Sequence, residues 1–332
     1  MTTPKHRSGF HAGIVNPLSL VGNEVKSILR DRSFPFSRVA LLDSTGEHAG
    51  ALTEMGDEPA FVAASSNEEL EDLDLVFFCG PPEGNREWIE RAGPGRFIAI
   101  DLSQPTTIEN GTLVIAGVNL DELPARTNPI VSPHPIAIPI ALVLHGIAPV
   151  AAVDSCTATV VQPASEFGQA GVEEVAAQAI SVLNVKPVPR NVFDRQVAFN
   201  LFPAAEGNED VIVSQVRAVT NPRTELALMI TQGTIFHSHT FSLFLRLADE
   251  VSVETIVDAL KKSSAMAFAE GDQQYGTIDA AGRDEVLIAE VRADRNVERG
   301  IWVWAVCDNL RRSSALNAVL IAEKVLFDTT TH

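Results

Sequence analysis

Two histidines separated by a single residue, His237 and His239, carry the side chains best suited to chemistry in this sequence. Side chains of a β-strand alternate between its two faces, so both imidazoles would share a face if this segment is a strand. A neutral imidazole can take a proton from a reacting group or bind a metal ion. The pair therefore indicates a general base or part of a metal site, and the alternative is a histidine without function beside a surface histidine.

The stretch VSPHPIAIP at residues 131–139 is the second candidate, because it lies between two apolar runs. The stretch lies where a nucleotide-binding half of the chain would meet a second half. We expect a catalytic nucleophile in this stretch. No cysteine lies in the stretch. Its central residue, Pro135, has no thiol, no hydroxyl and no backbone N–H. The absence of a nucleophile governs the interpretation of the other motifs.

A turn that could bind phosphate follows the first expected strand, which ends at residues 13–15. Dinucleotide-binding folds use glycines here because they let the pyrophosphate approach the N-terminus of the next helix. Only Gly22 stands at such a position, although Asn16 can adopt a left-handed conformation. Ser19 places a side chain where a phosphate needs backbone contact. The turn is therefore a weak indication of a working nucleotide-binding loop, and the alternative is a fold that keeps the turn and has lost the ligand.

Asp43 ends the second expected strand, where an acidic residue usually hydrogen-bonds the ribose hydroxyls of a dinucleotide. Asp43 and Glu47, without an arginine beside them, disfavour a 2′-phosphate. NAD is therefore expected in preference to NADP if a dinucleotide binds. The alternative is that Asp43 is only a turn residue at the end of a strand.

The elements that would position these residues alternate between strands and helices over residues 9–133. We expect strands at 39–43, 73–79, 97–101 and 114–118, and helices at 21–30 and 85–92. Strands separated by helical segments favour an α/β fold with a Rossmann-like parallel sheet and helices on both faces.

The second half, residues 134–308, predicts an α+β domain in which helices pack on one face of a sheet. Expected strands lie at 153–161, 226–236, 241–247, 285–292 and 301–306. Expected helices lie at 171–183 and 253–266, and a long amphipathic helix covers 308–327.

Composition narrows the class of protein. A chain of 332 residues suggests about two domains. The formal net charge of −18, without a basic patch, excludes a nucleic-acid partner. No apolar run reaches the roughly 18 residues of a membrane span, so no membrane partner is expected.

Three cysteines, an odd and sparse set without metal-ligand spacing, favour a reducing compartment and a cytoplasmic location. Each thiol is expected to be a small buried apolar group rather than a nucleophile. The cysteines are Cys79, Cys156 and Cys307.

Three segments then carry a resemblance to a known family. They are VFDRQVAFNLFP at 192–203, the run from Trp304 to Glu323 that contains WAVCDNLRR, and the turn that ends at Gly22. Over nearly its whole length the chain resembles the aspartate-β-semialdehyde dehydrogenases, particularly their diverged Usg-like branch. The resemblance implies a Rossmann-like domain at 9–133 plus a C-terminal helix at about 309–330. It also implies an α+β dimerisation domain of the glyceraldehyde-phosphate-dehydrogenase type at 134–308.

The family reaction implied by this resemblance is the reductive dephosphorylation of aspartyl phosphate with NADPH. It proceeds through a cysteine thioester, and a histidine moves the proton. The resemblance places retained positions at His239, the catalytic histidine, and at Gln162, its glutamine partner. It places lost positions at Pro135, the nucleophile, and at Gln232 and Thr107, the arginines for substrate carboxylate and for phosphate.

Several of the residues that the family reaction needs are missing from one site. Their absence favours a catalytically inactive dimeric paralogue, which could bind a metabolite or pair with an active relative. NADP or NAD is implied as cofactor by the resemblance alone, and the protein could equally bind neither. One alternative is an active semialdehyde dehydrogenase in which His239 serves as base for direct hydride transfer from a hydrated aldehyde. Another alternative is a metal site formed by His134, His237 and His239.

Overall fold

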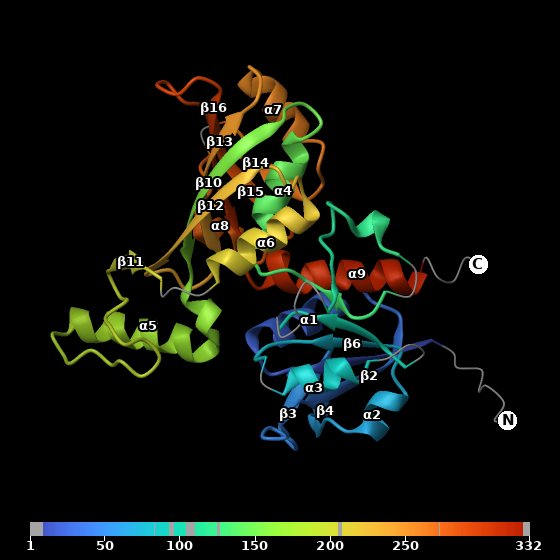
Figure 1. The fold of residues 1–332 in the computed structure, drawn as a ribbon. Coiled ribbons are helices and arrows are strands. Elements are labelled where there is room, and N and C mark those ends of the chain that lie inside the picture. The colour runs from blue at the N-terminus through green and yellow to red at the C-terminus, as the bar shows by residue number, and fades with distance from the viewer. Residues whose placement is uncertain are drawn as a thin grey trace. The chain divides into compact units, whose positions relative to one another are not determined.

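The computed structural model describes residues 9–82, 84–92, 96–103, 110–124, 127–204, 208–271 and 273–327. The chain divides into two compact units (Figure 1). The first unit contains residues 1–114, 122–132 and 315–332, and the second contains residues 115–121 and 133–314.

A parallel sheet forms the centre of the first unit, with seven strands in the described part of the chain, in the order β5-β2-β1-β6-β7-β9-β8. Strand β6 is buried on both faces, as an apolar run in a parallel sheet should be. The strands are β1 (Phe10–Val15), β2 (Phe36–Asp43), β5 (Ala63–Ala64), β6 (Leu75–Phe78), β7 (Ile98–Asp101), β8 (Thr112–Leu113) and β9 (Ile130–Val131). A separate antiparallel hairpin joins β3 (Leu52–Met55) and β4 (Glu58–Phe61).

Helices cover both faces of this sheet, so the predicted α/β arrangement is confirmed. Helices α2 (Asn67–Glu71) and α3 (Asn85–Glu90) pack their apolar residues against Val15, Val76 and Phe78. Helices α1 (Leu20–Asp31) and α9 (Leu316–Phe327) lie beside each other on the other face (Figure 1).

The second unit is built on a mixed sheet, with seven strands among the described residues, in the order β11-β12-β10-β13-β16-β15-β14. The strands are β10 (Val153–Gln162), β11 (Leu201–Pro203), β12 (Glu225–Gly233), β13 (His239–Leu247), β14 (Met266–Phe268), β15 (Val286–Ala293) and β16 (Gly300–Cys307). One face carries the main hydrophobic core, in which residues of α4 (Ala137–Ile147), α6 (Glu209–Val219) and α7 (Val253–Leu260) pack on β10, β13 and β16 (Figure 1).

The other face of this sheet is open to solvent in the single chain. On β10 the side chains of Thr157 and Thr159 are exposed, whereas Cys156, Ala158 and Val160 between them are buried. The remaining helix-like elements are η1 (Leu120–Glu122), η2 (Ala164–Phe167), α5 (Gly168–Leu183), α8 (Thr277–Ala280) and the π-helical turn η3 (Arg311–Ala315).

Two expected strands are wrong in part. Residues 114–118 do not continue the strand Thr112–Leu113, because Asn119 Oδ1 accepts a hydrogen bond from Ile115 N at 2.8 Å and closes a turn. Residues 234–236 likewise do not extend β12, which ends at Gly233.

Three expected helices are shorter than predicted, and the helix expected at 85–92 ends at Glu90. Helix α7 ends at Leu260, and Met266 belongs to β14. The C-terminal helix has regular α-helical geometry only from Leu316, because Asp308 accepts hydrogen bonds from the backbone N–H groups of Leu310 and Arg311 and the turn η3 follows. None of the described helices combines the length and the apolar character that a membrane span requires.

Candidate functional site

The turn between β1 and α1 is closed by its own hydrogen bonds. Ser19 Oγ donates to the carbonyl oxygen of Asn16 at 2.9 Å and accepts from Gly22 N at 3.0 Å, so it caps α1. A Cβ on residue 22 would lie 2.4 Å from Asn16 O and 2.8 Å from Pro17 Cα. Glycine at position 22 is therefore required by the packing of the turn on its own helix, without any ligand.

Asn16 adopts the left-handed conformation, with φ 58°, and its side chain joins the ends of neighbouring strands. Asn16 Oδ1 accepts hydrogen bonds from the backbone N and the hydroxyl of Ser44, both at 3.1 Å. Asn16 Nδ2 donates to Cys79 O at 3.1 Å and to Asn85 Oδ1 at 3.2 Å. These bonds occupy both polar atoms of the amide.

The carboxylate of Asp43 is used by the loop that follows it. Oδ1 accepts from Thr45 N at 3.1 Å, Thr45 Oγ1 at 3.0 Å and Gly46 N at 2.6 Å, and Oδ2 lies 3.0 Å from His48 Nδ1. Burial raises the pKa of Asp43, but these hydrogen bonds outweigh burial and lower the pKa below its usual value. Asp43 thus acts as a turn residue, and a ribose would have to displace these partners.

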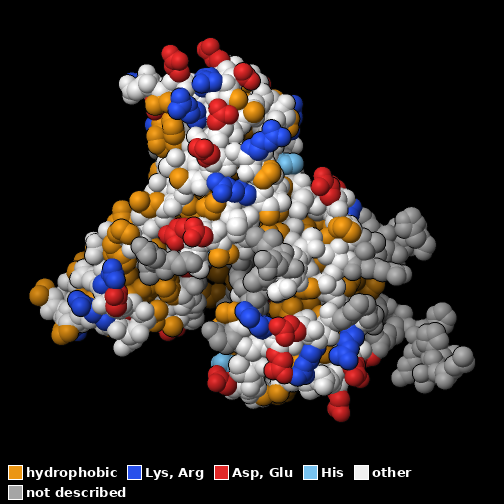
Figure 2. Space-filling view, viewed as in Figure 1, with side chains coloured by type: hydrophobic (Ala, Val, Ile, Leu, Met, Phe, Trp, Pro, Cys, Tyr) orange, Lys and Arg blue, Asp and Glu red, His pale blue; other side chains and the backbone are white. Residues whose placement is uncertain are grey.

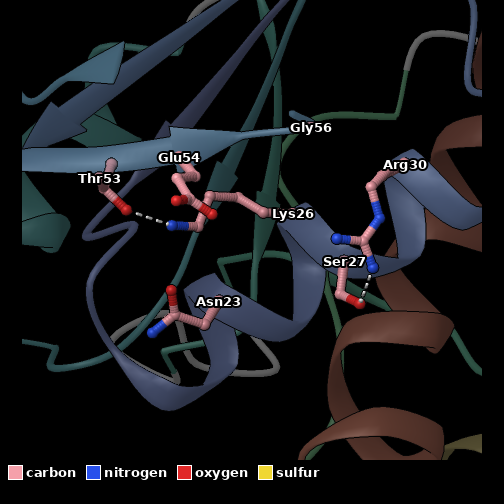
Figure 3. A pocket seen from close by; sticks show the side chains of 7 residues that line it. All are labelled: Asn23, Lys26, Ser27, Arg30, Thr53, Glu54 and Gly56. Carbon is pink, nitrogen blue, oxygen red and sulfur yellow. Dashed lines mark hydrogen bonds between the residues drawn. The ribbon is translucent and has the colours of Figure 1, made fainter. Parts of the chain in front are cut away.

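A hollow of about 370 Å³ lies on the outer side of α1, beside the β3–β4 hairpin (Figure 3). Lys26 reaches across it and donates to Thr53 Oγ1 at 2.7 Å. Burial lowers the pKa of Lys26, and the nearby carboxylate of Glu54 opposes this effect. Its lining contains none of the four residues predicted for cofactor binding and consists of Asn23, Lys26, Ser27, Arg30, Thr53, Glu54 and Gly56.

His239, the first residue of β13, lies at the centre of the candidate site in the second unit. Its side chain is 0% exposed, and neither ring nitrogen has a hydrogen-bond partner among the described residues. Buried polar atoms in native proteins nearly always have a partner, so two unpartnered ring nitrogens indicate a place that a ligand or water occupies. Glu166 Oε1, from η2, is 3.4 Å from His239 Nε2.

Glu166 is held in place by Asn309. Asn309 Nδ2 donates to Glu166 Oε1 and to Ser165 Oγ, each at 3.0 Å. Asn309 Oδ1 accepts from Ser238 N at 3.0 Å, so the same amide fixes the backbone next to His239. Burial raises the pKa of Glu166 to about 7, although the hydrogen bond from Asn309 opposes this effect.

His134 borders the same site. Its Nδ1 accepts a hydrogen bond from Ile136 N at 3.1 Å, which requires Nδ1 to be unprotonated, and its own backbone N donates to Gln215 Oε1 at 2.8 Å. Burial lowers the pKa of His134 to about 4. Burial, together with the nearby His134, also lowers the pKa of His239 well below its usual value. Both imidazoles are therefore neutral at pH 7.

The two glutamines at family positions bind each other. Gln162 and Gln232 are register partners on β10 and β12, and Gln162 Nε2 donates to Gln232 Oε1 at 2.9 Å. Gln232 Nε2 donates to the carbonyl oxygens of Gln162 at 3.3 Å and of Gly233 at 3.1 Å. Gln232, which the resemblance places at the position of a carboxylate-binding arginine, is thus a neutral amide with partners of its own. Thr107 lies outside the described residues.

The expectation that His237 and His239 share a strand face is wrong. Strand β13 begins only at His239, and Ser238 before it has φ 74°, so His237 does not share a strand face with His239. Across the described ranges, no three His, Cys, Asp or Glu side chains come together as a possible metal site. His134, His237 and His239 all belong to those ranges and do not form one.

The cysteines are buried, as predicted. Burial raises the pKa of Cys79 and raises those of Cys156 and Cys307 to about 12 each. A thiol in such surroundings stays protonated, so none of the three offers a thiolate at neutral pH.

The chain combines a parallel-sheet unit of Rossmann type with a mixed-sheet unit that has a histidine and a glutamine at strand ends. This is the two-domain architecture of the semialdehyde dehydrogenases. The family model described as semialdehyde dehydrogenase, dimerisation domain, matches residues 144–312. The chain therefore belongs to the semialdehyde dehydrogenase family.

Individual relatives agree with this assignment. The chain is 29% identical to a USG-1 protein homologue of Pseudomonas aeruginosa over 96% of its own length and 98% of that protein. It is 25% identical to an aspartate-semialdehyde dehydrogenase of Rickettsia bellii over the same shares. A solved structure of a probable aspartate-semialdehyde dehydrogenase from Pseudomonas aeruginosa superimposes with a TM-score of 0.91 at 27% identity, covering 97% of this chain and 100% of that one.

Glu166 and Asn309 are the site residues that the sequence analysis did not assign. Glu166 follows the retained Gln162 by four positions and stands among apolar and small residues. Asn309 belongs to the C-terminal motif that carried the resemblance. Nothing in that motif indicates that the Asn309 amide contacts η2. An acidic residue close after a retained catalytic position was the available signal.

Proposed function

We propose that this chain is a dimeric member of the semialdehyde dehydrogenase family that does not carry out the thioester-forming dephosphorylation of aspartyl phosphate. The proline at the nucleophile position carries the proposal, because Pro135 cannot form a thioester. The buried thiols of Cys79, Cys156 and Cys307 offer no replacement.

The substrate contacts support the same conclusion. A substrate carboxylate in this family is expected to bind a guanidinium, which provides two charge-assisted hydrogen bonds. Gln232 stands at that position and is already bonded to Gln162. Of the described residues, Gln162, Gln232 and the neutral His134 therefore offer no fixed positive charge to a doubly anionic acyl phosphate.

The residues of the first unit do not fit a nicotinamide dinucleotide well. Gly22 N, a donor that a pyrophosphate would use, is bonded to Ser19 Oγ, and the carboxylate of Asp43 is bonded to its own loop. The aspartate-semialdehyde dehydrogenase of Candida albicans has been solved with NADP, but its likeness to this chain, at 14% identity, concerns the fold. These contacts do not support a hydride-transfer step, so the non-covalent dehydrogenase is the weaker candidate.

The experiment that tests this proposal measures NADPH formation from aspartate semialdehyde, phosphate and NADP, with the purified chain and with the Rickettsia bellii relative as positive control. We expect no NADPH above the rate without protein, and intact-mass spectrometry should show no acyl adduct. Turnover that disappears in His239→Asn would contradict the proposal and favour the non-covalent dehydrogenase. Isothermal titration with NAD and NADP completes the test, and micromolar binding of either would show that the turn at Asn16–Gly22 still functions.

We also propose that the second unit forms a homodimer through the open face of its sheet. The family model is that of a dimerisation domain. Exposed apolar side chains gather on α5, β11 and the adjoining strands (Figure 2). They include Ile180, Leu183, Leu201 and Met229, which are 58–74% exposed in the single chain. Apolar surface of this kind marks a protein–protein interface.

A further inference from the structure

We propose that Glu166 and His239 form an acid–base pair that can move a proton between solvent and a small neutral hydroxy-carbonyl compound. The inference goes beyond the proposed function, which concerns only the chemistry that the site has lost. It rests on the distance of 3.4 Å between Glu166 Oε1 and His239 Nε2 and on the buried Nδ1 of His239, which has no hydrogen-bond partner among the described residues.

The two side chains differ in their access to solvent. His239 is 0% exposed, whereas the side chain of Glu166 is 18% exposed. When His239 Nδ1 takes a proton from a carbon of the compound, the proton on Nε2 can therefore pass to the ionised Glu166 carboxylate and from there to water. The C–H bond breaks as an N–H bond forms at Nδ1, the Nε2–H bond breaks as an O–H bond forms at Glu166, and no oxidant, reductant or other reactant is needed.

The ionisation of the pair supports this role. Burial raises the pKa of the Glu166 carboxyl to about 7, so both of its protonation states are populated at neutral pH. Among the described residues, the titratable groups that face His239 are Glu166 on η2, His134 before α4 and Cys307, its register partner on β16. His134 is neutral above about pH 4 and the Cys307 thiol is protonated, so Glu166 is the member of this group that changes charge near pH 7.

The neighbouring side chains indicate the class of compound. Gln162 and Gln232 are uncharged, and both histidines are neutral at pH 7, so these groups provide no fixed positive charge for a phosphate or carboxylate. A neutral imidazole and a protonated carboxyl are together donors and acceptors for a carbonyl and a hydroxyl group. Enolisation of such a compound needs a base that removes a proton from carbon and an acid at the carbonyl oxygen, without nucleophile or hydride.

The first part of the test follows the ring signals of His239 by NMR between pH 5 and 9, in the whole protein. In the native protein these signals should shift with a midpoint near pH 7, because ionisation of Glu166 3.4 Å away changes the field at the ring. In Glu166→Gln this transition should vanish, whereas in Glu173→Gln, an exposed acid on α5, it should persist. Identical pH titration curves of the His239 ring signals in the native protein and in Glu166→Gln would contradict the proposed acid–base pair.

The second part measures deuterium incorporation from D₂O into dihydroxyacetone, without dinucleotide or phosphate, so that it is independent of the dehydrogenase assay. We expect exchange above the buffer rate that falls at least about tenfold in Glu166→Gln and in His239→Asn, with Glu166→Asp recovering part of it. The control His145→Gln, at an exposed position of α4, should leave the rate unchanged. Exchange at the buffer rate, or exchange that Glu166→Gln does not slow, would overturn the assigned compound class.

Discussion

At the scale of single residues, Pro135, Gln232 and Glu166 carry the proposals about this site. Pro135 offers neither a nucleophile nor a backbone donor. Gln232 is a neutral amide that binds Gln162. Glu166 places a titratable carboxyl group 3.4 Å from His239 Nε2. We propose that a site with these three residues lacks acyl transfer and supports proton transfer.

A second buried acid, Glu174 on α5, has a structural role that can be predicted quantitatively. Its carboxylate accepts hydrogen bonds from the backbone N–H groups of Asn191 and Val192, both at 2.7 Å, and of Phe193 at 3.0 Å. Hydrogen bonds to a charged group contribute about 1.5–3 kcal/mol each, and a glutamine can keep some of them with its single carbonyl oxygen. We expect Glu174→Gln to lower the free energy of unfolding by about 2 kcal/mol, measured by urea denaturation at pH 7.

The pH dependence of this difference follows from the pKa of Glu174. Burial raises the pKa, but the hydrogen bonds from the loop outweigh burial and lower the pKa below its usual value. The stabilisation is therefore complete above the unfolded-state pKa, about 4.3, and is lost as the pH falls through the lower folded-state pKa. The difference between native protein and Glu174→Gln should shrink below about pH 4, whereas Glu173→Gln on the same helix should show no comparable difference at any pH.

At the scale of elements, helix α1 begins at a turn that is held by its own hydrogen bonds and packing. Ser19 caps the helix. Gly22 has no Cβ, so the first turn of the helix can pack closely against the backbone of Asn16 and Pro17. We expect Gly22→Ala to destabilise the protein by about 1–3 kcal/mol, because its Cβ would lie 2.4 Å from Asn16 O, a backbone atom that cannot simply rotate away.

Thermal unfolding of the two variants Gly22→Ala and Gly276→Ala measures this effect. Gly276 is the matched control, because a Cβ there would meet only Asp279 Oδ2 at 3.7 Å. Equal melting temperatures for the two variants would show that the turn can relax, and that glycine at position 22 is kept for another reason, such as contact with a phosphate.

The sequence predicted the elements that are long and strongly patterned, and it failed where a local hydrogen bond decides the conformation. The buried run at β6 and the alternation on β13 are clear in the sequence, and both strands form. Residues 114–118 are apolar enough for a strand, but the Asn119 side chain closes a turn there. A pattern of hydrophobicity does not contain such a bond.

For the candidate site too, the sequence predicted some features and missed others. The proximity of His134 to His239 was expected from the resemblance and is present in the structure. The contact between Glu166 and His239 depends on Asn309, which follows Glu166 by 143 positions and binds η2 through its side chain. The failure of the His237–His239 pair depends on the left-handed backbone of Ser238. Neither contacts between distant residues nor a single backbone angle can be obtained from spacing alone.

At the scale of the whole molecule, strand register arranges the open sheet face of the second unit into rows. Met229, Thr159, Ser242 and Trp304 are successive register partners across β12, β10, β13 and β16. Met229 and Trp304 are 58% and 42% exposed. The row has apolar residues at both ends and small hydroxyl side chains between them, and a second copy of the same sheet can pack on it about a twofold axis.

The substitution Thr159→Glu tests whether this face is the dimer interface. In a single chain the glutamate would be exposed and tolerated, because Thr159 lies on the solvent side of β10. In a dimer the twofold axis would bury two such carboxylates without partners, at a cost of about 3–5 kcal/mol for each unpaired charge. We expect light scattering during size-exclusion chromatography to give the mass of two chains for the native protein and of one chain for Thr159→Glu. Thr255→Glu, at an exposed position of α7, should remain dimeric, and a dimeric Thr159→Glu protein would place the interface on another surface.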